Sequence, residues 1–96
     1  MSTGKQVQDA IKELLRHYGA ESAVLFGSYA RGEQTAGSDI DVIVFGGRNF
    51  KKSNIFAFAE DLRQMTGKEV DAFEICEIDQ QTPFYRSVLE EGIRIA

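Results

Sequence analysis

Apolar residues recur at helical spacing in three parts of the chain. Between residues 5 and 18 they follow the i, i+3, i+4, i+7 pattern of an amphipathic helix, at Val7, Ala10, Ile11, Leu14, Leu15 and Tyr18. A second helix is predicted to begin at a cap, Ser53 or Asn54, and to end at Gly67. Thr82 followed by Pro83 is typical of a helix start, and that third helix is predicted to end at Gly92.

Between these helices lie short runs with the character of β-strands. Residues 23–26 are all apolar, residues 39–45 are rich in β-branched side chains, residues 69–78 alternate, and residues 93–95 suit a short final strand. A short helix is expected over residues 29–34. Strands and helices therefore alternate, which predicts an α/β fold whose residues 1–96 form a single domain. The order alone leaves open which neighbouring strands run parallel.

Composition narrows the classes of function. The net charge of −4 argues against nonspecific binding of nucleic acid, which needs a basic face. The one cysteine, Cys76, lies among apolar residues and is predicted to be a small core or strand residue. It cannot form a disulfide within the chain, and no apolar run is long enough to cross a membrane. These features favour a cytoplasmic protein.

Candidate chemistry begins where the first apolar run stops, at Gly27 and Ser28. Glycine lets the backbone turn sharply and lets a ligand approach closely. Ser28 is a favourable N-cap for a following helix. A strand that passes through such a turn into a helix start leaves backbone N–H groups pointing outward, and groups of this kind bind phosphate.

Two carboxylates follow ten residues later. If residues 39–45 form one strand, Asp39 and Asp41 share a face of it, whereas Ile40 and Val42 point into a core. Like charges side by side repel, and a divalent cation would offset that repulsion. The alternative is that both are charged residues on an edge strand, where they would protect against aggregation. That alternative accounts for neither the glycine-serine turn nor a third acidic residue, Asp71.

The combined string resembles a known family. Gly27-Ser28-Tyr29-Ala30-Arg31-Gly32, followed by Ser38-Asp39-Ile40-Asp41-Val42, is similar to the signature of the nucleotidyltransferase superfamily of DNA polymerase beta, and in particular to its minimal nucleotidyltransferases. The resemblance covers residues 23–75 with specific motifs. It implies a small mixed β-sheet with helices packed mainly on one side.

The same resemblance implies a site. Asp71 matches the third acidic residue of the family, on the strand expected beside the Asp41 strand, and Glu69 and Glu74 are its competitors. Asp39, Asp41 and Asp71 would hold two Mg²⁺ ions and carry catalysis, with Asp71 as the proton acceptor. Gly27 and Ser28 would hold the phosphates of ATP, and Arg31 and Ser38 are assigned to nucleotide binding with them.

Several roles stay open at this stage. Arg31 matches the family's arginine and would either contact phosphate or pair with an acidic residue and brace the loop. Residues 46–52, which include Arg48, Lys51 and Lys52, form either a solvated loop or a contact for triphosphate or a partner. His17, in the last turn of the first helix, is expected at the surface or in a capping role.

The acceptor is expected to come from a second polypeptide, because a chain of this size has no room for an acceptor domain. The resemblance implies a helical partner, a HEPN-family toxin, with transfer of AMP from ATP to one of its tyrosines; the chain would then be its antitoxin. Two alternatives remain: the catalytic subunit of a two-subunit small-molecule nucleotidyltransferase, and an antitoxin that acts by binding alone. A homodimer or hetero-oligomer is plausible. Candidate partner-facing aromatics are Phe50, Phe56, Phe84 and Tyr85.

Overall fold

The computed structural model describes residues 4–35 and 37–96. Its elements follow in the order α1 (Gly4–Tyr18), β1 (Ser22–Phe26), α2 (Ser28–Arg31), β2 (Ile40–Phe45), α3 (Asn54–Thr66), β3 (Val70–Glu74), the 3₁₀ turn η1 (Ile75–Glu77), α4 (Pro83–Glu91) and β4 (Ile93–Ile95). Every helix and strand expected from the sequence is present. No helix in these described ranges combines the length and the apolar character needed to span a bilayer.

The strands form one mixed sheet in the order β3-β2-β1-β4. β1 runs antiparallel to both of its neighbours, whereas β2 and β3 run parallel. The parallel pair is possible because the long helix α3 carries the chain back between β2 and β3. The mixed sheet implied by the family resemblance is confirmed, and so is the expectation that the strand bearing Asp71 lies beside the strand bearing Asp41.

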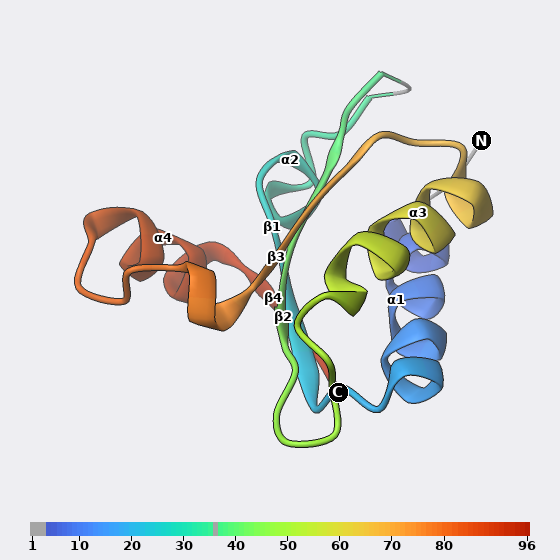
Figure 1. The fold of residues 1–96 in the computed structure, drawn as a ribbon. Helices are drawn as coiled ribbons and strands as arrows, with labels where there is room; N and C mark the ends of the chain where they lie inside the picture. The colour runs from blue at the N-terminus through green and yellow to red at the C-terminus, as the bar shows by residue number, and fades with distance from the viewer. Residues whose placement is uncertain (1–3, 36) are drawn as a thin grey trace.

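The two long helices, α1 and α3, lie side by side against one face of the sheet (Figure 1). The predicted apolar stripe of α1 is buried there together with inward residues of the sheet and of α3, at Val7, Ile11, Leu14, Leu15, Leu25, Ile40, Val42, Phe58 and Leu62. The opposite face carries α4, which buries Val88 against Val24 and Ile43. The prediction of helices mainly on one side is therefore confirmed, and α4 makes the other face a partly covered surface.

The start of α4 also agrees with the sequence. Thr82 is its N-cap, and its Oγ1 accepts a hydrogen bond of 3.3 Å from the backbone N–H of Tyr85. Pro83 occupies the first turn, where its missing N–H costs nothing.

Three local expectations were wrong. Gly27 and not Ser28 is the N-cap of α2, and α2 ends at Arg31 because Gly32 adopts a left-handed conformation there. β3 ends at Glu74 and not at residue 78. The side chain of Glu74 accepts a 2.7 Å hydrogen bond from the N–H of Cys76 and turns the chain into η1. Cys76 consequently lies exposed on η1 and is neither a core nor a strand residue.

The aromatic candidates for a partner surface differ in how far their side chains are exposed. Phe50 is buried in the core under α1 and α3, so it is no candidate for a contact surface. Phe56 on α3 is 79% exposed and Phe84 on α4 is 48% exposed, and Tyr85 is half-buried. His17 is exposed, as expected, with its ring edge-on to Tyr18.

Candidate functional site

The loop between β1 and α2 has a backbone that only glycine adopts readily. Gly27 has φ 71° and ψ −148°, in a region closed to residues with a β-carbon. Its carbonyl oxygen accepts hydrogen bonds from the N–H groups of Ala30 and Arg31. Helix geometry leaves the N–H groups of the first helical residues, Ser28 and Tyr29, without partners inside the helix. The loop can therefore present donors to an anion.

Asp41 lies directly against this loop. A β-carbon on Gly27 would overlap Oδ2 of Asp41 and would lie 3.3 Å from its Cγ. The contact follows from the antiparallel ladder, in which Phe26, the residue before Gly27, is the register partner of Asp41. A phosphate held at the loop would consequently be adjacent to a carboxylate, an arrangement that needs a cation between them.

Asp71 is the register partner of Asp41 across the parallel pair β2 and β3. The neighbours of both residues, Val42 and Ala72, pack toward the core under α1 and α3. Because side chains alternate along a strand, Asp41 and Asp71 point to the opposite face, the face that carries α4. The topology thus brings together two carboxylates that lie 30 positions apart in the sequence.

The electrostatics of Asp41 reflect this crowding. Its pKa is raised above the ordinary 3.8, first by partial burial and then by the negative charges of Asp71 and Asp39. A hydrogen bond with Asp71, which requires one of the two to hold a proton, raises it further, whereas the charge of Arg31 lowers it. Neighbouring carboxylates that raise the pKa of Asp41 favour binding of a hard divalent cation, because the cation stabilises the ionised form.

Asp39 is placed differently from the expectation. It lies exposed and one residue before the start of β2, whereas the sequence placed it within the strand. Its charge nevertheless acts on Asp41. Within residues 4–35 and 37–96, no three His, Cys, Asp or Glu side chains converge into a ready-made metal cage. Asp41 and Asp71 would hold a divalent cation as a pair, and Asp39 would add the third carboxylate.

The two competitors of Asp71 occupy other positions. Glu69 precedes β3, and its backbone carbonyl accepts a 2.9 Å hydrogen bond from the N–H of Ile40. Glu74 is buried at the far end of β3, where its carboxylate is used by the N–H groups of Cys76 and Gly46. Of the three acidic residues, Asp71 is the one that stands opposite Asp41.

Arg31 and Ser38 are engaged within the loops that flank the site. Nε of Arg31 donates a 2.9 Å hydrogen bond to Oε1 of Glu33, and this ion pair raises the pKa of the guanidinium. The structure thus shows Arg31 paired with an acidic residue, and its charge also acts on Asp41. Oγ of Ser38 accepts a 2.8 Å hydrogen bond from the N–H of Thr35, so Ser38 holds the turn before Asp39.

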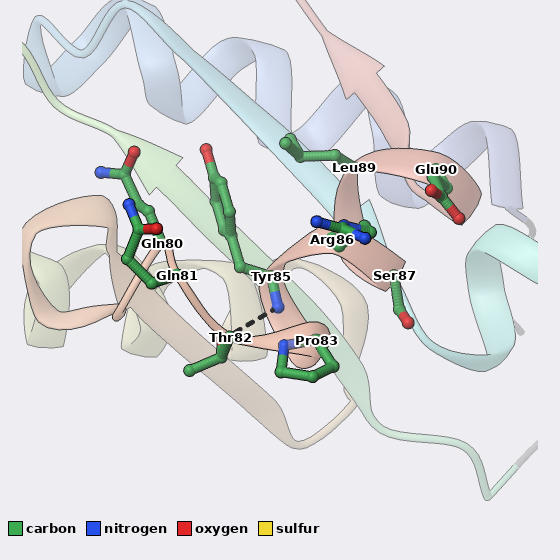
Figure 2. Close-up of a pocket in the computed structure, with 9 residues that line it drawn as sticks. All are labelled: Gln80, Gln81, Thr82, Pro83, Tyr85, Arg86, Ser87, Leu89 and Glu90. Atoms are coloured by element: carbon green, nitrogen blue, oxygen red, sulfur yellow. Dashed lines mark hydrogen bonds between the residues drawn. The ribbon is translucent and has the colours of Figure 1, made fainter.

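Of the surface pockets on the α4 side of the sheet, two differ in their relation to the candidate site. The larger, about 430 Å³, is lined only by residues 80–90 of α4 and the segment before it, and none of the predicted site residues enters it (Figure 2). The smaller, about 280 Å³, is lined by Gly27 and Arg31 together with Phe26 and α4 residues. Its α4 wall was missed by the sequence reasoning, because no motif marks residues 84–91 and only the fold brings them to Gly27.

The polymerase beta nucleotidyltransferase family model matches residues 9–96 of this chain. A relative from Methanocaldococcus jannaschii, named "Putative protein adenylyltransferase MJ1379", is 38% identical over 93 residues, which cover 86% of this chain and 91% of the relative. The aligned region thus includes most of both proteins.

Solved structures share the fold. The structure of a "putative minimal nucleotidyltransferase" is 26% identical, with TM-score 0.76 over 96% of this chain and 95% of that one. A chain of a toxin-antitoxin crystal structure with AMP-PNP has TM-score 0.78 and 24% identity, covering 93% and 72% of the two chains. A chain of the tri-AMPylated Shewanella oneidensis HEPN toxin in complex with MNT antitoxin has TM-score 0.73 and 20% identity, covering 98% and 72%. Together with the family match, these likenesses show that the chain belongs to the polymerase beta nucleotidyltransferase family.

Proposed function

We propose that this chain is a Mg²⁺-dependent adenylyltransferase that moves AMP from ATP to a tyrosine hydroxyl of a helical HEPN-family toxin, and so acts as its antitoxin. The main support for this activity is the close approach of Gly27 to Asp41. Asp41 is in turn the register partner of Asp71. An anion-binding loop and paired carboxylates at one point of the sheet are the parts that nucleotidyl transfer requires.

The acceptor and the nucleotide are proposed from the relatives. The name of the M. jannaschii relative supports transfer to a protein. Toxin-antitoxin complexes with AMP-PNP and with an AMPylated HEPN toxin contain chains of the same fold, and they support ATP as the donor and a HEPN toxin as the acceptor. The net charge of −4 agrees with an acceptor other than nucleic acid.

The residues of this chain would divide the work as follows. Backbone N–H groups of the 27–29 loop and the hydroxyl of Ser28 hold the β and γ phosphates. Asp39 and Asp41 would hold the Mg²⁺ ions, and Asp71 would complete the set of ligands. Bound Mg²⁺ would supply charge neutralisation at the phosphates and a lower pKa for the acceptor hydroxyl. Position and charge, and no covalent intermediate, provide the rate enhancement.

The transfer would take place in a single displacement at the α-phosphorus. The acceptor oxygen forms a bond to the α-phosphorus of ATP while the bond from that phosphorus to the bridging oxygen of pyrophosphate breaks. The proton of the acceptor hydroxyl passes to Asp71, and pyrophosphate leaves with the electron pair. Asp71 suits this role because it flanks Asp41 on β3, on the side of β2 away from the phosphate loop.

The test is transfer to the protein encoded beside this chain's gene. The purified chain, at a tenth of the partner's concentration or less, is mixed with Mg²⁺-ATP and the partner, and the partner is weighed by intact mass spectrometry. A gain of one or more AMP units on a tyrosine, lost in Asp41→Asn, is expected. Asp71→Asn should lose the gain as well, whereas the matched control Glu69→Gln should keep it.

Other results would point elsewhere. A tight complex with an unmodified partner, formed only at equal amounts and without ATP, would indicate an antitoxin that acts by contact. AMP found on a small molecule bound by the partner would indicate a two-subunit enzyme. Full activity in Asp41→Asn would overturn the assignment of the site.

A further inference from the structure

A pocket of about 280 Å³ opens beside the phosphate loop on the α4 face of the sheet. One wall consists of Phe26, Gly27 and Arg31, and the facing wall is the side of α4 that bears Phe84, Ser87 and Glu91. Gly27 belongs both to this pocket and to the contact with Asp41. The pocket is therefore continuous with the candidate site, unlike the larger pocket of Figure 2.

The pocket has an aromatic wall with an accessible ring. Phe26 and Phe84 meet edge to face, with ring centroids 5.7 Å apart and an interplanar angle of 81°. This contact fixes the orientation of Phe84 while the side chain stays 48% exposed. A large apolar ring held in place at the surface offers a stacking platform, and a purine is a ring system of suitable size and flatness.

Polar residues also line the pocket, and one of them, Arg31, interacts electrostatically with the candidate site. The charge of Arg31 interacts with those of both Glu91 and Asp41. The carboxylate of Glu91 and the hydroxyl of Ser87 provide acceptors for hydroxyl or amino groups. Apolar walls with a few polar groups are the usual composition of a small-molecule site.

We propose that this pocket binds the nucleoside of the nucleotide substrate, with the base against Phe84 and the ribose or the exocyclic amine at Glu91 and Ser87. The proposal rests on the proposed function, because it assumes that the triphosphate lies at Gly27. The position of the pocket favours the nucleoside over the acceptor. It lies by β1 and α2, whereas Asp71, the proposed acceptor-side residue, lies on β3 across β2.

The test separates binding of the base from binding of the phosphates. Affinities for AMP-PNP and for tripolyphosphate, each with Mg²⁺, are measured by calorimetry on the full chain. Phe84→Ala should weaken AMP-PNP binding about tenfold or more, since base stacking is lost, and should leave tripolyphosphate binding unchanged. Phe84→Trp, which keeps a stacking ring, should bind AMP-PNP as well as the wild type does. Glu91→Gln should weaken AMP-PNP binding and leave tripolyphosphate binding no weaker.

Phe56→Ala is the matched control, because Phe56 is an exposed phenylalanine on α3, across the sheet from the pocket. It should bind both compounds as the wild type does, and thermal unfolding checks that each variant is folded. Unchanged AMP-PNP binding in Phe84→Ala would overturn the nucleoside pocket and leave the proposed function standing. Equal loss of both compounds in Phe84→Ala, or the same loss in Phe56→Ala, would also overturn it. A wild type that binds neither compound would overturn the proposed function itself.

Discussion

The α-carbon of Gly27 lies so close to the carboxylate of Asp41 that no side chain fits between them. Two independent features of the chain meet in this contact. The positive φ of Gly27 turns β1 into α2, and the register of β1 with β2 sets Asp41 beside that turn. Gly27 would therefore have two roles. Its backbone conformation would present N–H donors to phosphate, and its missing side chain would leave room for Asp41 to reach a metal ion.

Gly27→Ala should therefore damage function and stability together. The β-carbon would overlap Oδ2 of Asp41 and occupy a glycine-only backbone region, at a cost of about 1–3 kcal/mol. Gly32→Ala is the matched control: Gly32 has a similarly positive φ, but nothing lies within 4 Å of the added carbon. It should cost about 1–2 kcal/mol and leave binding of Mg²⁺-AMP-PNP intact. Urea unfolding and calorimetry measure both effects, and intact binding in Gly27→Ala would contradict the proposed loop.

Asp41→Asn should change how stability depends on pH. The folded protein holds the Asp41 proton more tightly than the unfolded chain does, since the folded pKa is raised above 3.8. Ionising Asp41 therefore costs stability as the pH rises through the ordinary carboxyl pKa, and the cost levels off above the raised pKa. Without Mg²⁺, Asp41→Asn should match the wild type near about pH 3 and exceed it near neutral pH in free energy of unfolding. Glu69→Gln serves as the control; an advantage of Asp41→Asn that shrinks with rising pH would be inconsistent with this placement.

Adding Mg²⁺ should raise the melting temperature of the wild type at neutral pH. A ligand that binds the folded state alone stabilises it by mass action, and here it would also relieve the repulsion around Asp41. Asp41→Asn and Asp71→Asn should lose most of this increase, and Glu69→Gln should keep it. A differential scan from zero to millimolar Mg²⁺ provides the measurement. An increase of the same size in all three variants would place the ion elsewhere.

Local patterns predicted much of this fold because each pattern depends only on residues that lie close together in the sequence. The stripe of α1 from Val7 to Leu15 and the cap of α4 at Thr82 need only the helical period and a hydroxyl at the right place. The position of the Asp71 strand beside the Asp41 strand was anticipated through the family motif, but their register was not. The strand directions were not, since they depend on how crossovers pack.

What the sequence could not predict depends on contacts between distant segments. No residue near Phe26 in the sequence indicates that Phe84 packs against it, so the pocket beside Gly27 could not be predicted. Asp39 was counted in the strand because its alternation with Asp41 continued the pattern, whereas β2 begins one residue later. Glu74 was weighed as a competitor of Asp71, but its carboxylate accepts a hydrogen bond from the N–H of Gly46, in the loop after β2.

Glu74→Gln should be clearly destabilising although it lies away from the candidate site. The buried carboxylate accepts from the N–H of Cys76 at 2.7 Å and from the N–H of Gly46 at 3.3 Å, so it ties η1 and the loop after β2 to the end of β3. Glutamine has one carbonyl oxygen for these two donors, and an unpaired buried N–H costs about 1–3 kcal/mol. Glu77→Gln is the control, because exposed Glu77 accepts one hydrogen bond, from the N–H of Glu74, and an amide oxygen can replace that acceptor.

The pH dependence of Glu74→Gln should run opposite to that of Asp41→Asn. Burial alone would raise the pKa of Glu74, but the hydrogen bonds from Cys76 and Gly46 outweigh it and hold the pKa below the ordinary 4.5. The contribution of Glu74 is therefore present in full above that ordinary value and is lost as the pH falls through the lowered pKa. Chemical unfolding at neutral pH and near about pH 3 should show the gap between wild type and Glu74→Gln closing in acid. A gap that stays constant with pH would mean that the shape of the side chain, and not its charge, holds the two loops.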